Sequence, residues 1–515
     1  MTRRPSLSAP SRCLRFALLG LAAAAALALS ACTVGPDFRP PEAPAAQGYG
    51  TPDEDTSIPD AGPGTGRQTV VGRKVAADWW MLFHSRDIDD LVQAAIADNR
   101  ELAAARATLE QAHEAVVAAE GDLYPHLDLN GDVSRQRVNP VEFGINAPAT
   151  TFNLYSVGPV VSYALDPFGG NRRAVEREEA RAEVQAYQLG AAYLSITGNA
   201  VTQAIEIASI NAQIAVVEKI LAVDKQTLGL VQAAREAGSG SDVDVLTARS
   251  QLDADQALMP PLRQQLSVAK HALSILVGRA PHDWAPPSFD LGRLNLPSEL
   301  PLSVPSELVH QRPDIMAAEA RLHAASAEIG IATAQLYPNI TISAMVSAEA
   351  SNPGHMFTPA GLIWSAAAAL TAPIFHGGTL EAQRKGAVDA YQASLATYEQ
   401  TTLKSFAQVA DTLQALAHDA ELLRAERHAL DTATALLARQ RLRYTAGEDT
   451  ILLMLDAQRQ QHRASLGLVR AEARRYRDTV QFFTAMGGGW WQSSEAKSAA
   501  RTVGGAKTEI SEGAR

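Results

Sequence analysis

The stretch Leu123-Tyr124-Pro125-His126-Leu127-Asp128-Leu129-Asn130-Gly131-Asp132-Val133-Ser134 joins a helical pattern to a strand pattern. The residue before a proline resists the helical region, so Leu-Tyr-Pro predicts the end of a helix over about 87–120. From Leu127 to Ser134, apolar and polar residues alternate strictly, which indicates a strand with one apolar and one polar face. The chain therefore combines helices with amphipathic strands.

The same junction occurs again at Leu336-Tyr337-Pro338, and other landmarks also recur about 210 residues further on in the same order. Four landmarks of the first half recur in the second: Pro167-Phe168-Gly169-Gly170 matches Pro373 to Gly378, Ala237-Gly238 matches Ala446-Gly447, Leu246-Thr247-Ala248 matches Leu455-Asp456-Ala457, and Val277-Gly278 matches Met486-Gly487. Chance similarity between alanine-rich helices does not keep order and spacing together. We therefore expect an internal two-fold sequence repeat, with copies at 84–280 and 303–490.

Each copy has the same predicted plan. A first helix (87–120 or 303–336) is followed by two strands, a very long helix (169–237 or 377–446) and a return helix (241–278 or 449–486). Gly238 and Gly447 are expected to end the long helices as left-handed caps. Pro260-Pro261 should kink the first return helix.

The long helices carry a coiled-coil pattern. A heptad seam runs through the first at Val184, Tyr187, Ala191, Leu194, Gly198, Val201, Ile205, Ala208, Ala212 and Ala215. At about 1.5 Å per residue, a helix of some 70 residues is about 100 Å long. This pattern alone also fits a fibrous coiled coil that only separates other parts.

Four segments read as strands, around 127–133, 155–165, 340–346 and 362–368. Their lengths are close to that of a tilted membrane-crossing strand, although strands of soluble sandwiches alternate in the same way. Four strands cannot close a barrel, and open strand edges are not tolerated in lipid. If these strands cross a membrane, several chains must share one barrel.

The N-terminus has the features of a lipoprotein signal peptide at 1–31, with four arginines, a short apolar run and then Leu29-Ser30-Ala31-Cys32. This tetrapeptide resembles the bacterial lipobox, in which the cysteine is acylated. Cys32 is thus the predicted lipidation site, and Thr33 in place of an aspartate points to the outer membrane. The segment 32–80 is rich in proline and glycine and is predicted to be an extended tether, and 492–515 a disordered tail.

Composition excludes other classes of protein. The net charge of −11 disfavours nucleic-acid binding. No zinc-protease, serine-hydrolase or phosphate-loop motif is present, and Gly62-Pro63-Gly64-Thr65-Gly66 lies in the predicted tether, so we expect no enzyme activity, no metal and no cofactor beyond the lipid. His376-Gly377-Gly378 is expected to be a turn. No stretch after Cys32 is expected to form a membrane-spanning helix.

Together these features resemble the TolC-like outer-membrane factors, and among them the lipoprotein outer-membrane subunits of resistance-nodulation-division type tripartite efflux systems. The residues that carry the likeness are Cys32 to Phe38, Leu123-Tyr124-Pro125, Ser162 to Asp166, Tyr444 to Gly447, Leu455 to Gln458 and Gly487 to Trp490. The resemblance implies a mainly α chain with membrane β-strands. It implies a homotrimer with a 12-stranded β-barrel, four strands from each chain, continued by a long α-helical barrel in the periplasm of a diderm bacterium. The partners implied are a periplasmic adaptor protein, an inner-membrane pump and outer-membrane lipid.

The family's periplasmic gate lies where the long helices turn into their return helices. By match to the family pattern, Asp456 is the candidate for a carboxylate ring, with Leu452 or Leu453 as an apolar constriction beside it. Asp244 and Tyr444 are candidate latch residues, and Arg441 and Arg459 are possible partners. Asp449 stands where a basic latch residue can occur in relatives. Each charged residue could instead be an ordinary solvated group at a helix end.

The function expected is that of an outer-membrane exit duct, which passively conducts small amphipathic compounds delivered by the pump. Two alternatives stay open at this point. One is the exit duct of a type I protein-secretion system, which would share the fold. The other is a non-porous periplasmic coiled-coil scaffold.

Overall fold

The computed structural model describes residues 33–42, 48–50, 68–493 and 496. The predicted signal peptide, Cys32, the Gly62–Gly66 segment and nearly all of the tail lie outside these residues. The chain divides into two compact units, which are described separately. Unit 1 comprises Met1–Pro40, Gln111–Glu183 and Glu319–Thr397, and unit 2 comprises Pro41–Glu110, Val184–Ala318 and Tyr398–Arg515.

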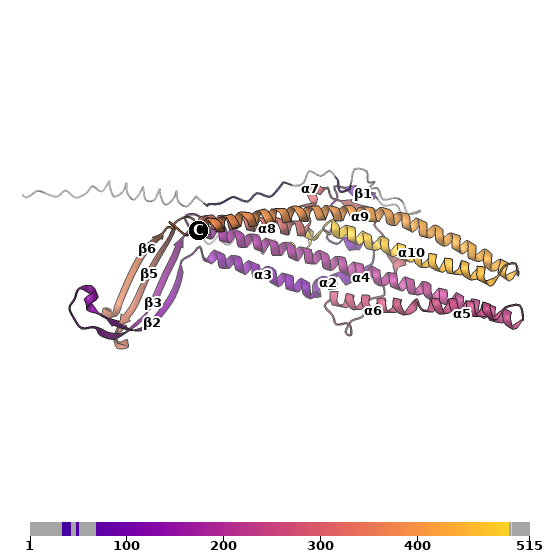
Figure 1. Cartoon of the computed structure of the whole chain (residues 1–515), viewed down its shortest axis with the longest axis horizontal. Helices are drawn as coiled ribbons and strands as arrows, with labels where there is room; N and C mark the ends of the chain where they lie inside the picture. Colours follow the sequence, from indigo (N-terminus) through magenta and orange to yellow (C-terminus); the bar gives the residue numbers. More distant parts are fainter. Residues whose placement is uncertain (1–32, 43–47, 51–67, 494–495, 497–515) are drawn as a thin grey trace, which may run out of the picture. The chain divides into compact units, whose positions relative to one another are not determined.

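Unit 1 contains a four-stranded antiparallel sheet of order β2-β3-β5-β6 (Figure 1). The strands are β2 His126–Val138, β3 Thr150–Leu165, β5 Asn339–Ala350 and β6 Leu362–Thr371. Short 3-10 turns lie in the connections, at η2 Pro140–Phe143, η4 Pro353–His355 and η5 Pro359–Gly361. The four predicted strands are confirmed, and the alternation begins in register, with Leu127 opposite Val161.

Apolar side chains on the outer strands of this sheet face solvent. Leu127, Leu129 and Val133 are each at least 70% exposed, and Trp364 on β6 is 76% exposed. Within the described residues, β2 and β6 each pair along one edge only. Unpaired edges next to exposed apolar surface are a template for further pairing and are not stable in isolation. Among the described residues, nothing covers these two edges.

The residues that directly follow Cys32 are held on unit 1. The Val34 amide donates to the Phe168 carbonyl at 3.0 Å, and the buried Arg173 donates to the Val34 carbonyl at 3.2 Å and to Asp37 at 2.8 Å. Gly35 has a φ of +94°, and a Cβ there would lie 2.5 Å from the Cα of Gly330. Only glycine fits this contact, because both the backbone angle and the space exclude a side chain.

The first helices of the two predicted repeats are each interrupted, which corrects the expected single helices. One consists of α2 Arg86–Asp98 and α3 Arg100–Gly121, and the other of α7 Pro305–Leu308 and α8 Pro313–Ala334. Asn99 accepts hydrogen bonds from the Glu101 and Leu102 amides through its side chain, so a new helix begins there. Pro313 lacks an N–H and is well suited to the first position of a helix.

The long helices are α4 Gly170–Glu236 and α9 Thr379–Thr445, of 67 residues each. The return helices are α5 Asp242–Gln256 with α6 Met259–Leu276, and α10 Ile451–Ala485. The break between α5 and α6 falls just before Pro260-Pro261, as a proline kink requires, and the prolines occupy the first turn of α6.

Helix α4 is buried more widely than the predicted seam. The predicted seam is only partly buried, since Tyr187, Ala191, Leu194 and Ala212 are half-buried and Ala215 is exposed. A neighbouring stripe is buried along its whole length; it contains Leu189, Tyr193, Ile196, Ala200, Ala204 and Ile207. By length and composition, α4 also contains a window that could cross a membrane, with a mean hydropathy of 1.3. No such helix was expected after Cys32. In the structure, 56% of this window is buried. A helix that packs on neighbours on two sides carries apolar residues on both faces. Its high mean hydropathy is explained by this packing alone.

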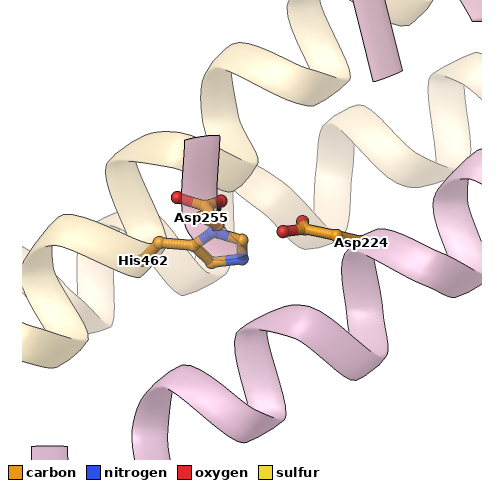
Figure 2. A group of neighbouring side chains, drawn as sticks. All are labelled: Asp224, Asp255 and His462. Carbon is orange, nitrogen blue, oxygen red and sulfur yellow. Dashed lines mark hydrogen bonds and ion pairs between the residues drawn. The ribbon is translucent and has the colours of Figure 1, made fainter. Parts of the chain in front are cut away.

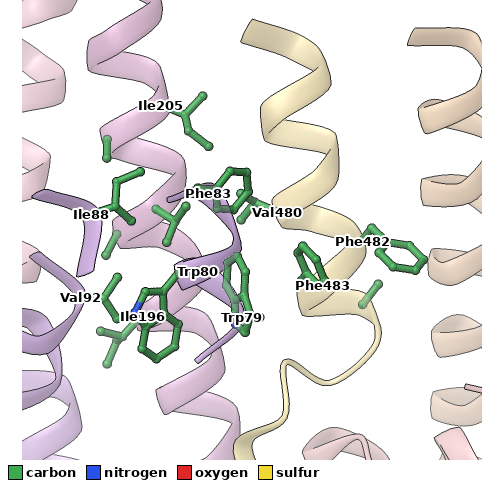
Figure 3. Close-up of a cluster of buried hydrophobic side chains, with 14 of the residues drawn as sticks. Trp79, Trp80, Phe83, Ile88, Val92, Ile196, Ile205, Val480, Phe482 and Phe483 are labelled. Carbon is green, nitrogen blue, oxygen red and sulfur yellow. The ribbon is translucent and has the colours of Figure 1, made fainter. Parts of the chain in front are cut away.

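The core of unit 2 gathers around aromatic residues from both ends of the sequence (Figure 3). Trp79 and Phe83 of η1 Trp79–Phe83 are buried, and Trp79 stacks on Phe483 at 5.2 Å between ring centroids. The strand β1 Gln68–Val71 pairs in parallel with β4 Glu299–Leu302, and the 3-10 turns η3 Leu291–Arg293 and η6 Trp490–Gln492 complete the unit. Residues 68–71 therefore belong to a sheet and Trp79 to the core, so the tether predicted for 32–80 does not reach residue 80. Burial of the aromatic side chains stabilises the fold here.

Candidate gate at the two helix turns

Both long helices end in the same backbone motif. Gly238 and Gly447 have φ values of +79° and +74°. At the first turn the Gly238 amide donates to the Arg235 carbonyl and the Ser239 amide to Ala234. At the second, Gly447 donates to Tyr444 and Glu448 to Arg443. These are Schellman caps, and the two glycines predicted as left-handed caps are confirmed.

The first turn is stabilised by local hydrogen bonds. Ser241 and Asp244 form a capping box, in which the Asp244 amide donates to Ser241 Oγ at 3.2 Å and the Ser241 amide donates to Asp244 Oδ2 at 2.9 Å. Arg235 and Asp242 form an ion pair at 2.5 Å across the turn. The carboxylate of Asp244 is thus committed to starting α5, where it also lies favourably at the helix N-terminus.

The second turn is closed by ion pairs. Arg443 lies 3.0 Å from Asp449 and 3.5 Å from Glu448. The Thr450 side chain forms no capping hydrogen bond at the start of α10. Asp449 stands at the position where a basic latch residue can occur in relatives. Its carboxylate is only 11% exposed and pairs with Arg443 at the end of the preceding helix, α9.

The two turns pack on one another through a small apolar cluster that is separate from the main core. It contains Val231, Ala248, Ile451, Met454 and Leu455, with Leu228, Val245, Leu437 and Tyr444 at its margin. Burial, followed by the negative charge of Asp244, raises the pKa of the Tyr444 phenol. The structure thus brings the predicted latch residues Asp244 and Tyr444 into one neighbourhood, although the hydrogen bonds of each lie within its own turn.

The remaining predicted gate residues lie on the exposed face of α10. Leu452 is 53% and Leu453 is 49% exposed. Asp456 accepts from Gln460 at 2.7 Å and pairs with Arg459 at 3.4 Å, both on its own helix. Arg441 is exposed and forms no ion pair within the described part of the chain. Arg459 is therefore the partner of Asp456, and two leucines and one carboxylate are presented outward together.

A groove of about 630 Å³ runs between α5 and α10, next to these residues. Apolar side chains of both helices line it, with Leu452, Leu455 and Leu246 near the turns. Asp255 and His462 line its other part. The groove thus connects the exposed leucines to a polar cluster between the helices.

That cluster is formed by Asp224 of α4, Asp255 of α5 and His462 of α10 (Figure 2). His462 Nδ1 lies 3.3 Å from Asp255 Oδ2, and Gln458 donates to Asp224 Oδ1 at 2.5 Å. Burial raises the pKa of Asp224 to about 7, with Asp255 adding to the shift, and burial lowers the pKa of His462. Three ionisable groups from three helices thus meet in a largely dry space.

The sequence carries one signal of this cluster, although it does not by itself predict the three residues together. Val217, Ile220, Asp224, Thr227 and Val231 follow the heptad step along α4, and all are buried. An aspartate at a seam position predicts a polar partner on a facing helix. Which residues would supply it could not be known without the pairing of the helices.

Comparison with known proteins places these features in a family. The family model "Outer membrane efflux protein" matches residues 91–279 and 304–488. The chain is 29% identical to the pyoverdine export outer membrane protein OpmQ of Pseudomonas aeruginosa over 437 residues, covering 84% of this chain and 92% of that protein. It is 27% identical to the toluene efflux pump outer membrane protein TtgC of Pseudomonas putida over 488 residues, covering 93% and 96%.

The fold is similar to that of the outer-membrane channel OprN, with a TM-score of 0.80 at 27% identity, covering 89% of this chain and all of that one. A crystal structure of the open state of the Neisseria gonorrhoeae channel MtrE gives a TM-score of 0.76. The two family matches span most of the described residues, including both helix turns, and the chain therefore belongs to the outer membrane efflux protein family.

Proposed function

We propose that the chain is the outer-membrane exit duct of a tripartite efflux pump and works as a homotrimer. The observation that carries this is the sheet of unit 1, with four strands, two edges unpaired within the described residues and exposed apolar side chains. Three copies would pair β2 of one chain with β6 of the next and close a 12-stranded barrel, which leaves no edge in the lipid. Membership in the efflux family supports this assembly.

The two helical halves of the chain support a continuation of the barrel into the periplasm. Their order of a helix, two strands, a long helix and a return helix occurs at 84–280 and again at 303–490, and we take these as two copies of one unit. Six long helices, two from each chain, would then line a helical tunnel. The duct needs no catalytic group, because the inner-membrane pump supplies the energy and the duct conducts passively.

The gate is the pair of turns. In a threefold assembly, each side chain that faces the axis occurs three times, so Asp456 forms a ring of three carboxylates and Leu452 or Leu453 an apolar constriction. Opening requires the second turn to move away from the first, which exposes the cluster around Ile451, Met454 and Leu455 to water. Tyr444 lies at the margin of this contact, near Asp244, and the two would act as its latch.

Lipidation of Cys32 would fix unit 1 to the outer membrane. Val34, Gly35 and Asp37 are held by Arg173, and Gly35 also packs closely on Gly330, so a lipid at Cys32 would be attached directly before a segment fixed to unit 1. Docking to a periplasmic adaptor would use the exposed residues at the turns, and the transported compounds would be small amphipathic molecules, in line with the export of pyoverdine and toluene named for the relatives.

Single-channel recording in planar bilayers tests the gate. We expect the wild-type protein to show a small resting conductance and Asp456→Ala to raise it several-fold, because the carboxylate ring and its pairs with Arg459 and Gln460 are lost. Asp431→Ala, at an exposed position of α9 far from the turns, is the matched control and should leave the conductance unchanged. An unchanged conductance in Asp456→Ala would reject the ring, and a protein that never inserts into bilayers would reject the duct.

A further inference from the structure

The cluster of Asp224, Asp255 and His462 is not needed for a passive duct and has the composition of a metal site. Its ligand atoms all lie within 4.8 Å of one another. Asp224 is 2% exposed and His462 5% exposed, so neither is an ordinary solvated group. We propose that these three residues bind a divalent transition-metal ion, with Zn²⁺ as the best fit, and that the ion links α4, α5 and α10 close to the gate.

An unused ligand atom points to a cation. Asp224 Oδ2 is buried and has no hydrogen-bond donor among the described residues. Two carboxylates face each other there, and His462 is the ionisable group that contacts Asp255, at 3.3 Å. Burying two like charges is unfavourable unless a positive charge compensates them, and a divalent ion neutralises both.

The donor set selects the ion. One imidazole nitrogen with two carboxylates suits Zn²⁺ and similar first-row ions, whereas Mg²⁺ and Ca²⁺ prefer sites made of oxygen only. Outer contacts that orient the ligands are in place, since Gln458 donates to Asp224 Oδ1 and Gln251 donates to Asp255 Oδ2 at 2.6 Å. Thr227 donates in turn to Gln458 at 3.4 Å.

The ion has an access route and a free coordination position. Asp255 and His462 line the groove of about 630 Å³ between α5 and α10. Asp224 is not among the lining residues and points toward them from the other side (Figure 2). Three protein ligands leave a fourth position for water on the groove side. Asp255 is only about 16 Å along α5 from Asp244, at a rise of 1.5 Å per residue. An ion here would therefore hold both turns in their packed arrangement.

Titration of the purified, EDTA-treated protein with Zn²⁺ alone tests the site. We expect one ion for each chain, and binding at least about tenfold weaker in Asp224→Asn and in His462→Gln. Asp419→Asn removes one acid from a different buried pair, and His418→Gln removes an exposed histidine, so both controls should bind as the wild type does. Mg²⁺ in large excess should not compete.

Two further measurements keep the test independent of folding defects in a variant. Co²⁺ bound to the wild-type protein should give a visible absorption band that the two ligand variants lack. Zn²⁺ should slow hydrogen exchange of amides in α5 and the first turns of α10 in the wild-type protein only. Equal Zn²⁺ binding by the wild type and Asp224→Asn, or no binding by the wild type, would overturn the proposal and leave a proton shared between Asp224 and Asp255.

Discussion

The helices of unit 2 bury two pairs of carboxylates, and the pairs resemble each other closely. Asp224 faces Asp255, and Asp419 on α9 faces Asp478 on α10. Asp224 and Asp419 are 2% and 1% exposed, and each has one oxygen without a hydrogen-bond donor among the described residues. Burial, with the neighbouring acid adding to it, raises the pKa of both Asp224 and Asp419 to about 7.

The pairs differ in what compensates their charge. Arg474 Nε lies 2.9 Å from Asp419 and 3.5 Å from Asp478, so the second pair has a permanent cation from the chain itself. The first pair has His462, whose pKa burial lowers, and two glutamines. Arg474 compensates one of the two acids in the second pair, so that pair still takes up one proton, whereas the first pair has no permanent cation and must take up protons or an ion. The same burial thus gives a structural ion pair in one place and a candidate binding site in the other.

The largest expected effect concerns the pH dependence of stability at the Asp419 pair. The folded state binds this proton up to about pH 7, whereas an unfolded aspartate releases it near pH 4. The folded state therefore holds more protons between these values, and stability falls as pH rises through that window. Between pH 5 and pH 8, Asp419 should account for a loss of roughly 3 kcal/mol, and Asp419→Asn should remove it.

Thermal unfolding in detergent, followed by circular dichroism at several pH values, measures this effect. The variant should be more stable than the wild type at pH 8 and no more stable at pH 5. Asp411→Asn, an exposed substitution on the same helix, is the control and should keep the wild-type slope. Parallel curves for the wild type and Asp419→Asn would show that the pair is not protonated in the folded protein.

Removal of the permanent cation should have the next largest effect. Arg474→Met keeps much of the side-chain volume but leaves Asp419 and Asp478 without their partner. Breaking a fully buried pair costs about 3–5 kcal/mol, and because Arg474 is half exposed and partly screened we expect about 2 kcal/mol at pH 8. The cost should shrink at pH 5, where one acid is protonated.

Chemical denaturation at the two pH values distinguishes this from a general loss of packing. Arg384→Met breaks a more exposed ion pair with Glu381 and should cost less than about 1 kcal/mol at both. An Arg474→Met variant whose loss is the same at pH 5 and pH 8 would show that the arginine acts through its aliphatic stem instead of its charge.

How far the sequence predicts the molecule can be seen from these same helices. The glycines at 238 and 447, the strand alternation after Pro125 and the proline break in the return helix act through the local backbone, and the structure confirms them. The breaks at Asn99 and Pro313 were missed because a helical pattern continues across them. The stacking of Trp79 on Phe483 could not be predicted, because the two residues lie about 400 positions apart in sequence.

For the candidate gate, the sequence predicts the two turns but not the pairings between their residues. Leu452, Leu453 and Asp456 are exposed, and the pairing of Asp456 with Arg459 follows from their helical spacing. The ion pair of Arg443 with Asp449 and the Asp224 cluster depend on how the turns and helices fold against one another. Charge in a sequence indicates that a partner is needed, and only the fold identifies it.

The smallest expected effect concerns the neutral hydrogen-bond donors beside Asp224, which the Asp419 pair lacks among its described contacts. Thr227 donates to Gln458 Oε1 at 3.4 Å, and this orients Gln458 so that its amide donates to Asp224. The Asp419 pair has no such chain of neutral donors among its described contacts. Thr227→Val keeps the shape and removes the hydroxyl, and because the bond is long we expect a loss of about 0.5–1 kcal/mol by chemical denaturation in EDTA at pH 8.

Thr412→Val is the matched control, because Thr412 is as buried as Thr227 but its hydroxyl bonds only to backbone carbonyls of its own helix, Gln408 and Val409. Those carbonyls keep their helical partners when the hydroxyl is removed, so this control should cost less. Under the same conditions, a Thr227→Val loss no larger than that of Thr412→Val would mean that Gln458 is oriented by packing alone. A larger loss would show that the neutral donors Thr227 and Gln458 stabilise Asp224, as Arg474 stabilises Asp419.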